Sequence, residues 1–375
     1  MTDISEHDAE QALIEQVLAA ADAGTPLCIR GGGSKDFYGN PARASRTLDC
    51  ATHRGVVAYE PSELAITVRA GTPLADVEAL LQANGQQFPF EPPHFGPAAT
   101  IGGMVAAGLS GPRRPYAASV RDAVLGVRLL NGRGQALGFG GRVMKNVAGY
   151  DLSRLMAGSL GVLGVLLEVS LKVSPAPVGR MTLVQEQSLS GALALMRRWA
   201  RRSLPVTATA WSGGRLSVRI CGSEDALAES HRLIGGLPLP DADRFWQDLR
   251  EQRLDFFAGE APLWRLSLPP ATPLECLDAV CAGDDPGADQ LVEWGGAQRW
   301  LRGDLPADGL RAAATAAGGH ATLFRAGADQ AAPAAIPVGG VFTPLQPVVL
   351  RLHRNLKQAF DPAGLFNPGR LYPEF

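Results

Sequence analysis

The sequence of 375 residues is poor in the residue types that build metal sites and disulfide frameworks. It has five cysteines, none in a Cys-x-x-Cys pair, and six scattered histidines. An odd cysteine count without paired spacing argues against a disulfide framework and against a zinc or iron–sulfur site. No histidine lies in the paired-histidine and acidic cluster that a catalytic metal requires. We therefore expect no metal site and a reducing, cytoplasmic environment.

Long apolar runs and dense positive charge are also missing. No stretch approaches the length needed to cross a bilayer, and the polar, acidic residues 1–8 are unlike a cleavable secretory signal. The net charge is −2, and the one basic cluster, at residues 197–202, is typical of a solvated helix face. These features exclude a transmembrane segment and argue against nucleic acid as a partner. Peripheral docking at the inner face of the cell membrane stays open.

Glycine, in contrast, is abundant, and three glycines in succession follow the short apolar run at residues 26–29. Glycine tolerates positive φ and has no Cβ, so such a loop can turn backbone amides toward a phosphate and let it approach closely. Plain turn chemistry explains three glycines about as well. The spacing fits neither a Rossmann fingerprint nor a P-loop. The candidate residues, with a hydroxyl donor and two possible countercharges, are Arg30, Gly31, Gly32, Gly33, Ser34 and Lys35.

A second unusual segment runs from Phe88 to Gly111. Five prolines and glycines precede Thr100, Ile101, Gly102 and Gly103, and small residues then continue to Ser110. A stiffened loop that ends in a glycine pair suits a backbone lying against a flat or charged ligand. The alternative is a helix N-terminus packed tightly on a sheet.

The rest of the first half alternates between helix and strand patterns. A helix capped at Ser5 is expected to end before Gly24, and a strand is expected over Val120 to Asn131, followed by an Asn-Gly hairpin turn. Asp151 is interpreted as a helix N-cap rather than a catalytic acid. Further strands are predicted at 56–59, 65–70 and 165–173, and a helix from Pro73 to Leu81.

The Pro-rich and Gly-rich stretch 174–179 is the best domain boundary. After it, helices near 192–203 and 226–234 alternate with strands near 206–211 and 216–221, which indicates a mixed α+β sheet of the split βαβ kind. A final helix is expected at 348–360. The predicted domains are therefore 1–175, 176–340 and 341–375, the last returning to the first.

Several separated motifs occur in one order along the chain. They lie at residues 30–34, 100–103, 121–126, 145–152 and 158–164, with Asp361-Pro362 and Asn367-Pro368-Gly369 near the end. This ordered set resembles the FAD-binding domain of the vanillyl-alcohol-oxidase and p-cresol-methylhydroxylase (PCMH) type, found in flavin-dependent 2-hydroxyacid dehydrogenases. The resemblance implies an α+β protein with a PCMH-type FAD-binding domain of two α+β subdomains, a smaller ferredoxin-like α+β cap domain and a returning C-terminal segment.

Within that group, residues 144–151, the strand 166–173 and the chain length are similar to the FAD-binding E subunits of bacterial glycolate oxidases. The resemblance implies that residues 30–35 face the FAD pyrophosphate and that Thr100 to Gly103 present backbone to the phosphates and ribityl chain. It extends the same wall to Ser110, Gly111, Gly164 and Val165. It also implies a larger FAD-containing subunit and an iron–sulfur subunit as partners.

The resemblance also bears on how the flavin is held. Related enzymes that attach flavin covalently use a histidine in the first glycine loop, and Gly33 stands at that place, so FAD is expected to be non-covalent. This chain has Gly108 where relatives commonly carry asparagine, and Leu160 and Val162 where they carry polar residues. Those changes put side-chain contacts to the flavin in doubt more than backbone contacts.

No catalytic base is identified by the sequence. His353 beside Arg351 and Arg354 is a weak candidate, because the two arginines share a helical face from which His353 points away. We predict an FAD-dependent glycolate (2-hydroxy acid) oxidase or dehydrogenase subunit that passes electrons to an iron–sulfur partner. The alternative is a structural subunit with a flavin-domain fold, and a third, weaker hypothesis is an enolpyruvyl-UDP-sugar reductase.

Overall fold

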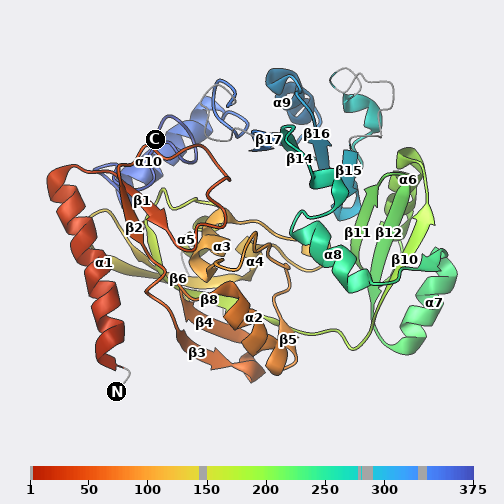
Figure 1. Cartoon of the computed structure of the whole chain (residues 1–375), viewed down its shortest axis with the longest axis horizontal. Helices are drawn as coiled ribbons and strands as arrows, with labels where there is room; N and C mark the ends of the chain where they lie inside the picture. The colour runs from red at the N-terminus through yellow and green to blue at the C-terminus, as the bar shows by residue number, and fades with distance from the viewer. Residues whose placement is uncertain (1–2, 143–149, 278–279, 281–289, 328–335) are drawn as a thin grey trace. The chain divides into compact units, whose positions relative to one another are not determined.

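The computed structural model describes residues 3–142, 150–277, 280, 290–327 and 336–375. The chain divides into two compact units, each made of separate stretches of sequence. The first unit comprises Met1–Ser110, Ala118–Ala176 and Pro344–Phe375, and the second comprises Gly111–Ala117 and Pro177–Thr343. Figure 1 shows the elements of both. The C-terminal residues thus belong to the same unit as the N-terminal ones.

The first unit is built on a five-stranded antiparallel sheet with the order β3-β4-β8-β6-β7. A parallel pair, β1 and β2, and a short pair, β5 and β9, complete its strands. The strands are β1 (Leu27–Arg30), β2 (Arg46–Asp49), β3 (Val56–Glu60), β4 (Ala65–Arg69), β5 (Gln86–Gln87), β6 (Val124–Leu130), β7 (Ala136–Gly140), β8 (Val165–Lys172) and β9 (Ser174–Pro175). The helices are α1 (Asp3–Ala23), α2 (Leu74–Ala83), α3 (Ile101–Ala107), α4 (Val120–Ala123), α5 (Leu152–Leu155) and α10 (Pro347–Phe360).

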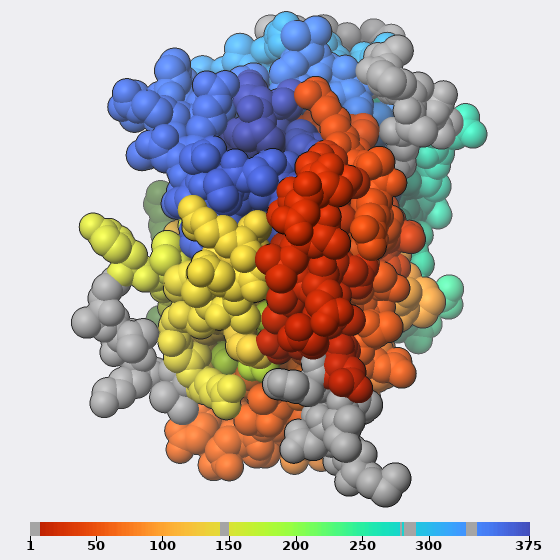
Figure 2. Space-filling model, turned by 90° about the vertical axis from the view of Figure 1, so that its left-hand side faces the viewer, coloured from red at the N-terminus to blue at the C-terminus, as the bar shows by residue number. Residues whose placement is uncertain are grey.

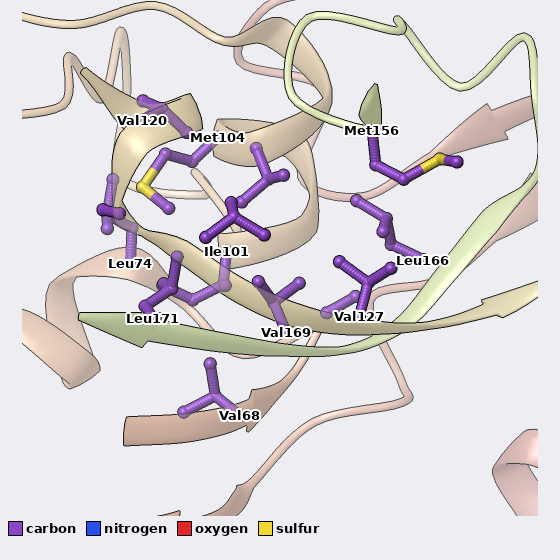
Figure 3. Close-up of a cluster of buried hydrophobic side chains, with 14 of the residues drawn as sticks. Val68, Leu74, Ile101, Met104, Val120, Val127, Met156, Leu166, Val169 and Leu171 are labelled. Carbon is purple, nitrogen blue, oxygen red and sulfur yellow. The ribbon is translucent and has the colours of Figure 1, made fainter. Parts of the chain in front are cut away.

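Strand β8 lies between two hydrophobic clusters, which explains its nearly continuous apolar sequence. Val169 and Leu171 pack in one cluster against Ile101 and Met104 of α3, as Figure 3 shows. Val165 and Leu167 belong to the other cluster, with residues of α1, β1 and the C-terminal segment. Figure 2 shows α1 in red on the surface of this unit, next to the C-terminal residues in dark blue.

Two expected boundaries of the first unit are wrong. Residues 120–123 form the short helix α4 before β6 begins, because the Ser119 hydroxyl accepts from the Asp122 N–H and the Asp122 carboxylate accepts from the Ser119 N–H. That reciprocal capping box stabilises a helical turn at what the sequence indicates is a strand start. Helix α1 begins at Asp3, two residues before the expected cap at Ser5.

The second unit is an eight-stranded antiparallel sheet with the order β13-β10-β12-β11-β15-β16-β14-β17. Its strands are β10 (Arg180–Glu186), β11 (Val206–Ser212), β12 (Arg215–Cys221), β13 (Leu237–Pro238), β14 (Leu263–Ser267), β15 (Gln290–Glu293), β16 (Gln298–Arg302) and β17 (His320–Arg325). Its helices are α6 (Leu189–Ala200), α7 (Glu224–Ile234), α8 (Ala242–Arg250) and α9 (Ala307–Ala316). Short 3-10 helices η1 to η5 lie at Pro61–Glu63, Arg114–Tyr116, Asp255–Phe257, Leu274–Leu277 and Trp294–Gly296, the first of them in the first unit.

The α+β class is confirmed, and the split βαβ strand order occurs twice. The strands β13-β10-β12-β11 form one four-stranded set, and β15-β16-β14-β17 form another with the same relative order. The two sets join where β11 pairs with β15, with Trp211 opposite Val292. The sequence pattern predicts one such set. Because β11 and β15 pair with each other, the two sets form a single sheet, and neither of these strands is left with an unpaired edge.

Candidate functional site

The glycine loop after β1 is shaped by close packing against another part of the chain. An added Cβ at Gly32 would overlap the carbonyl oxygen of Ala98, and one at Gly31 would overlap the hydroxyl of Thr100. Gly33 has a φ of +71°, and Arg30 covers the space beside it. Side chains are therefore excluded at all three positions, and the loop presents backbone alone to its surroundings.

The two cations that flank the glycines are both bound within the chain. Arg30 Nη2 lies 2.8 Å from Asp36 Oδ2, in a pair whose side chains are each about half exposed. Lys35 Nζ donates to the carbonyl oxygen of His94 at 3.0 Å and to Ser34 Oγ at 3.3 Å. Asp36 therefore balances the charge of Arg30, which the sequence offers as a countercharge for a phosphate.

The second segment, residues 100–103, opens α3 and packs on the sheet. Thr100 caps the helix, its Oγ1 accepting from the Gly103 N–H at 3.2 Å. An added Cβ at Gly102 would lie 2.7 Å from the Cβ of Ala70, so this glycine permits close helix packing. The structure thus has the tightly packed helix N-terminus that was the alternative interpretation of this segment, and Gly103 also lines the cavities described next. The Ile101 side chain is fully buried in the core.

These segments enclose two adjoining cavities, of about 290 Å³ and about 70 Å³. Both are lined by Gly31, Thr100, Gly103, Leu160 and Asn367. Four regions far apart in the sequence therefore meet in one hollow: the glycine loop, the start of α3, the loop before β8, and the C-terminal segment. All four lie in the first unit.

Most of the residues predicted for the site lie on the walls of these cavities. Ser110 does not, and its Oγ accepts from the Val120 N–H at 3.2 Å. Gly111 belongs to the second unit, where its carbonyl accepts from Trp294 Nε1. The predicted residues that line the cavities are Arg30, Gly31, Gly32, Gly33, Ser34, Lys35, Thr100, Gly102, Gly103, Gly164 and Val165.

Two lining residues near the C-terminus were missed as site residues, Asn367 and Arg370. The Asn367 amide accepts from the Ile29 N–H at 2.7 Å and donates to the carbonyl of Leu160 at 2.7 Å. The signal that could have found Asn367 is the terminal Asn-Pro-Gly motif, which resembles that of FAD-binding domains but does not by itself indicate a contact with the site.

A buried ion pair holds the C-terminal segment against the loop before β8. Lys357 Nζ donates to Asp361 Oδ2 at 2.6 Å and to the carbonyls of Val162 and Phe366, both at 2.8 Å. The Asp361 carboxylate in turn accepts from the Leu365 and Phe366 N–H groups. Burial lowers the pKa of Lys357, while Asp361 raises it. Every polar atom of this pair thus supports the two segments that carry Leu160 and Asn367.

The other candidates of the sequence do not reach the cavities. His353 Nδ1 lies 2.9 Å from the Val349 carbonyl, and its ring contacts those of Tyr372 and Phe375. Asp151 caps α5, its carboxylate accepting from the Arg154 N–H, as expected. Residues 145–149 of the motif at 145–152 fall outside the described residues. Over the part of the chain that the structure describes, no three His, Cys, Asp or Glu side chains form a metal-binding group.

Residues 6–140 match the FAD binding domain family. The glycine-lined hollow fits such a ligand, because Gly31, Gly32 and Gly33 line it with backbone alone, and close packing against Thr100, Ala98 and Arg30 leaves no space for side chains at these positions. Two solved structures of alkyldihydroxyacetonephosphate synthase share the fold, with TM-scores of 0.66 and 0.65 at 14% identity, and cover 96% and 95% of this chain and 74% and 75% of theirs. No described helix is long and apolar enough to span a bilayer.

Curated relatives extend the similarity beyond that domain. Glycolate oxidase subunit GlcD of Bacillus subtilis is 30% identical over 42% of this chain and 34% of its own length. Glycolate oxidase subunit GlcE of Escherichia coli is 48% identical over 99% of both chains. This chain therefore belongs to the family of GlcE-like, FAD-binding subunits of glycolate oxidase.

Proposed function

We propose that the hollow of the first unit holds FAD for a complex that oxidises glycolate to glyoxylate. The observation on which this rests is the backbone-lined cavity at residues 31–33 and Gly103, in a chain that is 48% identical to a glycolate oxidase subunit over nearly its whole length. Backbone amides of residues 31–34 would hold the phosphates. The N–H groups of Ile101, Gly102 and Gly103 donate to Thr72, Ala70 and Thr100 within the chain, so the segment from Thr100 to Gly103 would offer the ribityl chain a close backbone wall and no free amide donors.

Bound FAD would supply the two-electron acceptor that oxidation of a 2-hydroxy acid requires. The chain's own part is to bind the cofactor, orient it and keep water from it. Leu160, Ala106 and Val165 give the inner wall of the hollow an apolar surface. Such a wall suits a flat aromatic ring system, and the glycines suit its anionic end.

The cofactor is proposed to be non-covalent. No histidine lines either cavity among the described residues. Burial raises the pKa of the Cys50 thiol, which lines the smaller cavity, to about 12, so this thiol is protonated and poorly nucleophilic at neutral pH. Acid denaturation is expected to release intact FAD. Fluorescence remaining on the denatured chain in a gel would contradict this, and Cys28→Ser would test the other cysteine of the hollow.

The partners proposed are a larger FAD-containing subunit and an iron–sulfur subunit, the latter receiving electrons from flavin, in a complex docked at the inner face of the cell membrane. The names of the relatives support a complex, because both GlcE and GlcD are subunits of glycolate oxidase. Co-purification of the tagged chain with its co-expressed partners, followed by iron analysis of the complex, tests this composition.

The decisive experiment is an anaerobic visible spectrum of the purified chain, alone and with its partners, before and after glycolate is added. A flavin band that glycolate bleaches in the isolated chain would make it a self-sufficient dehydrogenase module. Bleaching only with partners present would assign it to electron relay within the complex. A chain that binds no flavin in either form would overturn the proposal in favour of the structural-subunit alternative.

A further inference from the structure

The cation best placed for a ligand of the hollow comes from the far end of the chain. Arg370 lines the 290 Å³ cavity together with Gly31, Gly32 and Gly33. It is brought there by the C-terminal segment, whose Asn367 accepts the N–H of Ile29 and whose Arg370 N–H donates to the Asn367 carbonyl at 3.0 Å. Figure 1 shows the C-terminus beside β1 and β2.

The guanidinium of Arg370 is fixed by the glycine loop itself. Its Nη2 donates to the carbonyl of Asp36 at 2.9 Å and to that of Lys35 at 3.3 Å. The backbone of Arg370 is also held, because its carbonyl accepts from the Asn40 N–H at 2.9 Å. A long side chain anchored at both ends has already lost much of its conformational freedom before any ligand binds.

Two bonds at one nitrogen leave donors of the planar fork on Nε and Nη1. Within the described part of the chain, no carboxylate lies within ion-pair distance of Arg370, whereas Arg30 is paired with Asp36 at 2.8 Å. Burial lowers the pKa of Arg370, yet arginine stays charged at neutral pH. The Asp36 carboxylate also acts on Arg370 electrostatically and raises its pKa. A partly desolvated cation with unused donors therefore faces the same hollow as the glycine amides.

We propose that Arg370 binds the diphosphate of the dinucleotide, closing from the C-terminal side the anion site that residues 31–34 form by their backbone. This assignment rests on the proposed function of the cavity. A planar guanidinium matches phosphate oxygens by two parallel hydrogen bonds, which a lysine at that position would not reproduce.

Arg370→Met tests this in the full-length chain by titration of the apoprotein with FAD and, separately, with riboflavin. The expected result is a loss of FAD affinity on the order of 10- to 100-fold, with riboflavin binding unchanged. The salt dependence of FAD affinity is also expected to weaken in the variant, since one ionic contact is gone. Arg370→Lys is expected to recover only part of the loss.

Arg43→Met is the matched control, because the Arg43 guanidinium also contacts the C-terminal segment, its Nη1 donating to the Pro373 carbonyl at 3.5 Å, but Arg43 does not line the cavity. The backbone N–H of Arg43, which donates to the Pro368 carbonyl, is kept in this variant. Arg43→Met is expected to bind FAD as the unaltered chain does. Equal losses for FAD and riboflavin in Arg370→Met would show a merely structural role and overturn the inference. Unchanged FAD affinity would do the same, whereas failure of the unaltered chain to bind FAD would overturn the proposed function instead.

Discussion

The two units each contain a cavity of about the same size, about 290 Å³ in the first and about 300 Å³ in the second, but their walls differ. The first is lined by glycine backbone from two distant stretches of the chain, residues 31–33 and Gly103, together with residues 160, 367 and 370. The second is lined by side chains such as Arg215, Phe245 and Phe256, all between residues 210 and 291, with no glycine among the described lining residues. Volume therefore does not identify the cofactor site; the chemistry of the wall does.

The comparison also separates two ways of building a cavity. In the second unit a sheet and the segment that follows α8 enclose the space within one stretch of sequence. In the first unit, the hollow exists only when residues near both chain ends meet. A cavity assembled from remote segments is sensitive to the contacts that join them, and the following variants measure that sensitivity.

Removing the buried cation is expected to have the largest effect. Lys357→Met leaves the Asp361 carboxylate buried without its partner, and the free energy of unfolding should fall by about 3 to 5 kcal/mol. Chemical denaturation measures this, with Lys172→Met as the control because Lys172 is exposed. A loss no larger than that of the control would show that the ion pair does not hold the C-terminal segment in place.

Filling the glycine loop comes next. Gly32→Ala places a Cβ on the Ala98 carbonyl, so the two segments must separate, at a cost of about 3 kcal/mol and with loss of FAD binding. Gly138→Ala is the matched control, since no heavy atom lies within 4 Å of its Cβ position and its stability should change little. If Gly32→Ala bound FAD with unchanged affinity, the glycine backbone would not be the feature that distinguishes the first cavity from the second.

Removing the side-chain amide of Asn367 is expected to have a smaller effect. Asn367→Ala removes the hydrogen bonds to Ile29 and Leu160, and the free energy of unfolding should fall by about 2 kcal/mol. FAD affinity should fall as well, because both partners lie on the cavity wall. Asn84→Ala, which removes an exposed amide bonded to the Leu80 carbonyl, serves for comparison and should leave the affinity alone.

Tyr372, in the C-terminal segment, is expected to make the stability of the fold fall at alkaline pH. Burial, with Tyr38 and Glu374 adding to it, raises the pKa of Tyr372 to about 12. Since the folded chain keeps a proton that the unfolded chain loses above about pH 10, stability should fall from there toward pH 12, on the order of 1 kcal/mol per pH unit. Denaturation curves of Tyr372→Phe should show less of this fall, and those of Tyr150→Phe, which alters a 97% exposed tyrosine, should show all of it.

The smallest effect is expected in the second unit. Arg215→Met removes a charged side chain from the cavity there, and FAD affinity should stay within about twofold. A clear loss of affinity in a fluorescence titration would mean that the second cavity also takes part in holding the cofactor, and the contrast drawn above would fail.

Much of the architecture follows from local sequence. The role of Asp151 as an N-cap does not depend on the tertiary structure, because its carboxylate needs only the N–H of Arg154, three residues further along the chain. The hairpin turn after β6 is likewise set by Asn131, whose side chain accepts from the Arg133 and Gln135 N–H groups. Helix α4 escaped prediction because it covers only one turn, and the apolar residues that follow it, from Val124, are typical of a strand.

The site was determined by the sequence only in part. The glycines at 31–33 and the glycine pair at 102–103 are recognisable because backbone approach requires that residue type wherever the partner lies. Which cations line the hollow, and how each is held, was decided by the tertiary structure: Arg30 is paired with Asp36, and Arg370, which we propose as the cation for the diphosphate, is brought from more than 300 positions away. Sequence spacing cannot show that, because the distance between chain ends in space is fixed by the packing of Lys357, Asp361 and Asn367 and not by local preference.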